Sequence, residues 1–160
     1  VYRDKKYFRF DQVLHIQKKV HFNADADRYK TFVAIEQLKL RGYNTLCPDY
    51  PQPKWFYDMC DKAGMFVIER MNLNSPTNSN IRTVGGTPAN DPALLEEYMT
   101  RAKAMYYRSR NHSCIIAYNL GSENSGNGYN MYKVYEWIKS VETERPVFYE
   151  GAEGEWNTDL

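Results

Sequence analysis

Short apolar segments alternate along this chain with longer segments in which apolar residues recur at helical spacing. The short segments have the length of strands, and the one at residues 65–69 is typical of a strand covered on both faces. They lie near residues 14–18 and at residues 43–47, 65–69, 114–119 and 146–149. Strands that alternate with helices pair in parallel through right-handed crossovers. The pattern therefore predicts an α/β fold built on one parallel sheet.

Four segments between these strands are predicted to be helices. The first begins near Asn23, carries apolar residues that include Tyr29, Phe32 and Leu40, and ends before Gly42, which suits a C-terminal cap. The other three helices cover residues 55–63, 91–110 and 131–138. Residues 70–90, rich in Asn, Ser, Thr, Gly and Pro, form a long loop before the third helix, and loops of this length are usually functional or mobile.

Composition excludes several classes of function. The 160 residues include 21 basic and 20 acidic side chains, so the net charge of +1 indicates neither a nucleic-acid surface nor a membrane surface. No apolar run is long enough to span a membrane. The 14 tyrosines and 3 tryptophans suit sugar or peptide ligands, although tyrosine also fills half-buried strand positions.

Cofactor chemistry finds no support in the motifs. The 3 cysteines contain no CxxC pair, and the histidines are not spaced as metal ligands, so neither a disulfide framework nor a metal site is expected. No glycine-rich phosphate-binding motif follows any predicted strand. We therefore expect no metal and no cofactor.

One carboxylate stands where parallel α/β folds place their chemistry. The strand at residues 114–119 runs into Leu120-Gly121-Ser122-Glu123, and the carboxyl ends of parallel strands carry the active sites of such folds. Glu123 is thus a candidate catalytic residue. The alternative is that it is a carboxylate favoured by the dipole of the helix that follows.

Four segments resemble, in order and spacing, the catalytic barrel of glycoside hydrolase family 2, which includes β-galactosidases and β-glucuronidases. They are YP followed by WFYDMCDKAGMFVI (50–68), RNHSCII (110–116), LGSE (120–123) and RPVFYEG (145–151). The family fold is an eight-stranded β/α barrel. The resemblance implies that residues 1–160 form a single incomplete TIM barrel of about five to six β/α units, the sixth strand beginning near Asn157. Its open edge strands would favour self-association.

The resemblance also implies a reaction. Retaining glycosidases use two carboxyl groups, one as acid/base and one as nucleophile, and the resemblance assigns the acid/base to Glu123. The family nucleophile is a Glu on the seventh strand, and no residue of this sequence matches it. The implied ligand is a carbohydrate, without nucleic acid or membrane. Export to the periplasm or the medium would suit a longer parent protein, but the chain shows no leader.

The rim of the implied barrel departs from the family pattern at several positions. Ser122 replaces an Asn, Asn124 is an extra residue, Asp49 replaces a His and Arg70 replaces an acidic residue. Asp49 is as well suited to capping the next helix as to contacting a ligand. The residues that we expect to bind substrate are Asp49, Asn72, Ser122, Asn124, Tyr149, Glu150 and Trp156, and Asn74 is a further hydroxyl partner.

Two functions follow from these observations. The first is a retaining, β-galactosidase-like glycoside hydrolase, of which this chain carries the acid/base half. The second is a non-catalytic carbohydrate-binding or structural barrel fragment, favoured by the altered rim and the unmatched nucleophile. A strand ending in Glu downstream of the chain would support the first function over the second.

Overall fold

The computed structural model describes residues 13–20 and 27–160, in which five strands form one parallel sheet in the order β1-β2-β3-β4-β5. The strands are β1 (Ile16–Val20), β2 (Thr45–Pro48), β3 (Phe66–Arg70), β4 (Ile115–Asn119) and β5 (Val147–Phe148). The helices between them are α1 (Arg28–Leu40), α2 (Lys54–Ala63), α3 (Leu95–Ser109) and α4 (Tyr129–Val141). Sequential strands lie next to each other, so the described chain forms four consecutive β/α units and a fifth strand of a partial β/α barrel, and the predicted fold class is confirmed.

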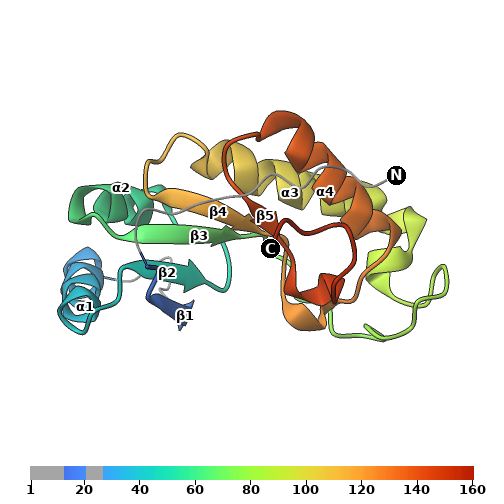
Figure 1. Ribbon diagram of the computed structural model, residues 1–160, viewed down its shortest axis with the longest axis horizontal. Helices are drawn as coiled ribbons and strands as arrows, with labels where there is room; N and C mark the ends of the chain where they lie inside the picture. Colours follow the sequence, from blue (N-terminus) through green and yellow to red (C-terminus); the bar gives the residue numbers. More distant parts are fainter. Residues whose placement is uncertain (1–12, 21–26) are drawn as a thin grey trace.

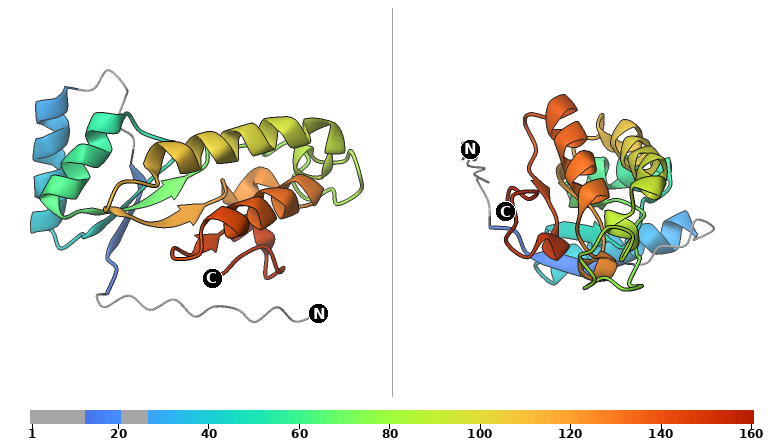
Figure 2. Two further views of the ribbon diagram at one scale, coloured as in Figure 1. Left: turned by 90° about the horizontal axis from the view of Figure 1, so that it is seen from above. Right: turned by 90° about the vertical axis from the view of Figure 1, so that its right-hand side faces the viewer.

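The helices pack on one face of the sheet and form the main core with it. Figures 1 and 2 show α3 and α4 side by side at the β4–β5 end, and α1 beside α2 at the β1–β2 end. Cys47, Ile68 and Ala117 form a small second cluster on the opposite face. That face carries the functional site described below. Within the described ranges, no helix is long and apolar enough to cross a membrane.

The predicted sixth strand is not formed. Residues 157–160 have no strand assignment, although the Asp159 N–H donates to the Val147 carbonyl at 2.8 Å. The Asp159 carboxylate also accepts the Val147 N–H at 2.8 Å and the Tyr135 hydroxyl at 2.6 Å. A side chain thus occupies the strand edge that a continuous ladder would use, and the segment runs beside β5 without extending the sheet.

Helix α1 confirms the predicted cap and part of the predicted apolar face, since Ile35 is buried and Leu38 packs against the core. The expected start near Asn23 lies outside the described residues, and the helix is capped by Asp27, whose carboxylate accepts the Tyr29 N–H at 2.9 Å. Gly42 follows the helix with φ of +89°. Tyr29, Phe32 and Leu40 are 73%, 44% and 88% exposed. The helix lies beside α2 and contributes Ile35 to the main core, whereas these three side chains lie outside that core.

Helix α2 carries a buried acid–phenol contact to β3. Glu69 is fully buried on the helix side of the sheet, and the Tyr57 hydroxyl donates to its carboxylate, 2.8 and 2.9 Å from the two oxygens. The same hydroxyl accepts the Gln52 N–H at 2.7 Å. Burial raises the pKa of Glu69 to about 8, while the Tyr57 hydrogen bond opposes that rise.

A second polar contact fixes the start of β4 to the end of α2. The Asp61 carboxylate accepts the Cys114 N–H at 2.7 Å and the Ser113 hydroxyl at 3.0 Å, and it lies 2.7 Å from His112 Nδ1. Desolvation would raise the pKa of Asp61, but the hydrogen bonds from His112, Cys114 and Ser113 outweigh it and lower that pKa. The motif segments that contain these residues therefore act here as structural connections.

Candidate active site

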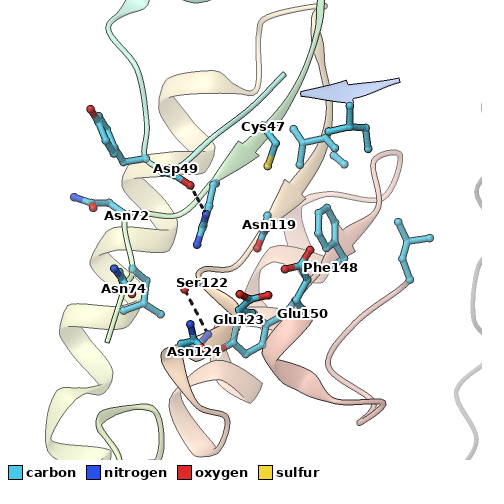
Figure 3. Close-up of a pocket in the computed structure, with 18 of the residues that line it drawn as sticks. Cys47, Asp49, Asn72, Asn74, Asn119, Ser122, Glu123, Asn124, Phe148 and Glu150 are labelled. Carbon is cyan, nitrogen blue, oxygen red and sulfur yellow. Dashed lines mark hydrogen bonds and ion pairs between the residues drawn. The ribbon is translucent and has the colours of Figure 1, made fainter. Parts of the chain in front are cut away.

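A cavity of about 1020 Å³ opens at the carboxyl ends of the strands, on the face of the sheet opposite the helices. Every strand or the loop that follows it contributes to the wall, as Figure 3 shows for the central part. Its polar lining consists of carboxylate, amide, hydroxyl and guanidinium groups from Asp49, Tyr50, Arg70, Asn72, Asn74, Asn119, Ser122, Glu123, Asn124, Tyr149 and Glu150. This is the end of a β/α barrel at which active sites are built.

Glu123 lies on this wall, directly after β4, and its side chain is exposed to the cavity. It is the first residue of a short 3₁₀ helix (Glu123–Ser125), and the Ser122 hydroxyl caps this turn by accepting the Asn124 N–H at 3.4 Å. The Ser122 N–H donates to the Leu73 carbonyl at 3.1 Å. The carboxylate is therefore carried by a turn that is attached to the loop after the neighbouring strand β3.

Gly121 is required for this attachment. Its φ is +150°, and a Cβ at this position would lie 3.2–3.3 Å from atoms of Leu73. The Gly121 N–H donates to the Asn119 side-chain carbonyl at 3.0 Å. Only a residue without a side chain lets the backbone approach this closely while it adopts that conformation.

The far side of the Glu123 turn is held by the loop after β5. The hydroxyl of the buried Tyr149 donates to the Gly126 carbonyl. The side-chain amides of Asn127 and Asn157 exchange two hydrogen bonds of 3.1 and 2.9 Å, and both residues are buried. Since buried amides are costly to leave unpaired, this reciprocal pair fixes the two loops relative to each other.

Asp49 and Arg70 meet across the cavity wall. Arg70 Nη1 donates to Asp49 Oδ1 at 2.8 Å, and the two side chains are 17% and 22% exposed. The alternative that Asp49 caps the next helix is wrong, because the N-cap of α2 is Pro53 and no side chain caps it. Pro51 and Pro53 lead the chain away from Asp49 before the helix begins, which leaves the carboxylate beside β3.

The structure brings together eight of the nine residues expected to act on substrate, Asn74 among them. Those that line the cavity are Asp49, Asn72, Asn74, Ser122, Glu123, Asn124, Tyr149 and Glu150. Trp156 does not: its ring packs on Tyr132 and Tyr135 of α4, with centroids 5.2 and 5.8 Å apart. The hydroxyl of Tyr149 is engaged with the Glu123 turn, so this residue supports the wall.

Three polar wall residues, Tyr50, Arg70 and Asn119, are not among the expected ligands. A signal for Arg70 was available, because side chains of a strand alternate between its faces. Ile68, Arg70 and Asn72 all line the cavity, whereas Glu69 points to the helices. Alternation counted from the expected ligand Asn72 would have included Arg70.

One group of side chains in the described part of the chain has the proximity of metal ligands. Ligand atoms of Asp58, Asp61 and His112 lie within 4.8 Å of one another. They lie at the start of β4, at the opposite end of the strand from the cavity. The Asp61 oxygens and His112 Nδ1 are already engaged with one another and with the N–H of Cys114, so the group acts as a structural connection.

Comparison with known proteins places this cavity in a family. Residues 27–160 match the model of glycosyl hydrolases family 2, TIM barrel domain. The chain is 37% identical over 124 residues to a β-galactosidase of Lactococcus lactis, which covers 74% of this chain and 12% of that protein. It is 39% identical over 123 residues to a β-galactosidase of Pectobacterium atrosepticum, covering 74% of this chain and 11% of the relative. The chain thus spans only a small part of the length of these relatives.

Solved structures show the same fold. A family 2 β-galacturonidase from Eisenbergiella tayi, bound to galacturonate, superposes with a TM-score of 0.65 at 20% identity, over 84% of this chain and 24% of that one. A β-glucuronidase from Parabacteroides merdae superposes with a TM-score of 0.64 at 15% identity, over 85% of this chain and 18% of that one. With the family match over residues 27–160, this fold shows that the chain belongs to glycosyl hydrolase family 2 and lies within its TIM barrel domain.

Proposed function

We propose that this chain supplies the acid/base half of the active site of a retaining β-glycosidase, with β-galactosides as the substrates to test first. The observation that carries the proposal is the position of Glu123, a carboxyl group on the cavity wall at the end of β4. The family membership and the relatives that are β-galactosidases support it.

Glu123 would act twice in such a reaction. As a carboxylic acid it would protonate the glycosidic oxygen while the bond to the leaving group breaks. As a carboxylate it would then take a proton from the water that releases the sugar. Its turn is held by β3 and β5 loops on both sides, which suits a group that must keep its position through two proton transfers.

The second carboxyl group of a retaining mechanism lies about 5–5.5 Å from the first. Glu150 is the other glutamate of the described cavity wall, whereas the family pattern places the nucleophile on a seventh strand, for which this sequence has no matching residue. The amides of Asn72, Asn74 and Asn124 would bind sugar hydroxyls, because an amide both donates and accepts hydrogen bonds.

Binding of an imino sugar tests the role of Glu123, because binding does not require a catalytic nucleophile. Galactonojirimycin carries a positive charge when protonated, and Glu123 is expected to hold it through a charge-assisted hydrogen bond. Glu123→Gln should weaken its binding at least ~10-fold, while binding of the neutral methyl β-D-galactopyranoside changes little. Glu144→Gln, in the exposed turn before β5, is the matched control.

Hydrolysis of aryl β-glycosides by the chain and by Glu123→Gln completes the test. Turnover that is lost in the variant would make Glu150 the first candidate for the second carboxylate. Unchanged imino sugar binding in Glu123→Gln would refute the proposal. It would favour the second candidate, a non-catalytic sugar-binding barrel. The departures from the family motif at Asp49, Arg70 and Ser122 also support this candidate.

A further inference from the structure

Two wall residues that depart from the family motif contact each other. Asp49 follows β2 where the motif has His, and Arg70 ends β3 where the motif has an acidic residue. Their hydrogen bond of 2.8 Å is the dashed line that starts at Asp49 in Figure 3. The two substitutions thus occur at residues that contact each other in this chain.

The Arg70 guanidinium is held by one of its nitrogens. Nη1 bonds to a single oxygen of Asp49, and Nε is buried without a hydrogen-bond partner in the described part of the chain. A guanidinium that pairs with a carboxylate in its preferred geometry uses two parallel bonds. The single bond seen here leaves N–H donors of Arg70, which lines the cavity, for a further acceptor.

The charges around the pair select the kind of acceptor. Asp49 neutralises Arg70, and the Glu150 carboxylate adds negative charge to the same wall. A carboxylate ligand would have to compete with Asp49 for the guanidinium and would be repelled by Glu150. A sugar hydroxyl both donates and accepts, so two adjacent hydroxyls can accept from Arg70 and donate to Asp49 without added charge.

We propose that Asp49 and Arg70 form a pair that binds two adjacent hydroxyl groups of a neutral sugar and thereby contributes to specificity. This inference rests on the proposed function, because it needs a sugar in this cavity. The pair contributes to the choice of sugar and takes no part in the proton transfers of Glu123.

Binding of a sugar and its monodeoxy analogues tests the pair. The probes are methyl β-D-galactopyranoside, its monodeoxy analogues and methyl β-D-glucuronide, titrated by NMR into the 160-residue chain. Removal of a hydroxyl that the pair binds should weaken binding by the wild type ~10-fold or more. Arg70→Met should lose this preference while it binds the deoxy analogue as the wild type does. Arg70→Lys, which keeps the charge without the fork, should restore only part of it.

The controls separate failure of the pair from failure of the site. Arg41→Met, at the exposed end of α1, should behave as the wild type. If Arg70→Met does not fold, the test uses Arg70→Lys, whose preference for the sugar over its deoxy analogue is compared with that of the wild type. An unchanged preference in the Arg70 variants, or tighter binding of the glucuronide by the wild type, would overturn the inference and leave the proposed function standing. Absence of binding of every probe by the wild type would contradict both.

Discussion

The buried carboxyl of Glu69 should make the stability of this chain fall as pH rises. Its ordinary pKa is 4.5, and burial raises it to about 8 in the folded chain. The folded state therefore holds a proton that the unfolded state has already lost. The stability that this proton contributes is fully present below pH 4.5 and is lost progressively as pH approaches about 8.

The size of the effect follows from the interval between the two pKa values. Each pH unit inside that interval costs about 1.4 kcal/mol, so Glu69 costs about 3 kcal/mol at pH 7 relative to acid conditions. Glu69→Gln keeps an oxygen that accepts the Tyr57 hydroxyl but removes the titration. The buried amide NH₂ adds a cost of about 1–3 kcal/mol. This cost does not vary with pH, so the quantity to compare between the wild type and Glu69→Gln is the slope of the unfolding free energy against pH.

The assay is urea unfolding followed by tryptophan fluorescence, at intervals from pH 5 to pH 8. The unfolding free energy of the wild type should fall across this range by about 1 kcal/mol per pH unit more than that of Glu69→Gln. Glu96→Gln, exposed on α3, is the matched control and should keep the wild-type slope. Tyr57→Phe removes a hydrogen bond that lowers the Glu69 pKa, so it should move the pH-dependent range upward. Equal slopes in the wild type and Glu69→Gln would refute the reasoning.

Three further changes test other parts of the structure. Gly126→Ala should lower the unfolding free energy in urea by about 1–3 kcal/mol more than Gly42→Ala does. Both glycines have positive φ, but of the two only Gly126 would place a Cβ against backbone, 2.8 Å from the Ser79 carbonyl oxygen. Equal losses would show that this contact is unimportant. Asp61→Asn should reduce the loss of stability in acid. The folded chain lowers the pKa of Asp61, so this carboxylate stabilises the fold above its unfolded-state pKa, and that stability is lost as pH falls through its folded-state pKa. An unfolding free energy that falls in acid as steeply as in the wild type would contradict this. Phe32→Lys should leave unfolding within about 0.5 kcal/mol of wild type and reduce any self-association seen in sedimentation, since this ring is 44% exposed on α1.

The order of elements could be predicted from sequence because each strand and helix carries its own local pattern. The strand at residues 65–69 and the helix ended by Gly64 are examples, and both are present as β3 and α2. Local pattern could not predict that Ile35 of α1 is buried while Tyr29, Phe32 and Leu40 stay exposed. Tyr29 and Leu40 have the spacing of a buried face, but what covers that face depends on neighbours that periodicity does not specify.

The candidate site was predictable where it depends on strand ends and unpredictable where it depends on contacts between loops. Glu123 follows β4 directly, so topology alone placed it at the cavity. The Asp49–Arg70 contact joins residues 21 apart in sequence, across two strands, and residue types alone did not reveal it. Trp156 was expected near a ligand because it follows β5, but its ring found aromatic partners on α4 instead.

The nearest-neighbour order of the sheet has a consequence for how the chain folds. In the part of the chain that the structure describes, every strand pairs with the strands next to it in sequence, so these pairings join segments that are close together in the chain. Short sequence separations between partners favour rapid folding, and each β/α unit can dock on the unit made just before it. Among the described strands, β1 lies at one edge of the sheet and pairs with β2, whereas β3 and β4 each pair with two strands. In the 160-residue chain, the amide hydrogens of β1 should therefore exchange with solvent sooner than those of β3 and β4.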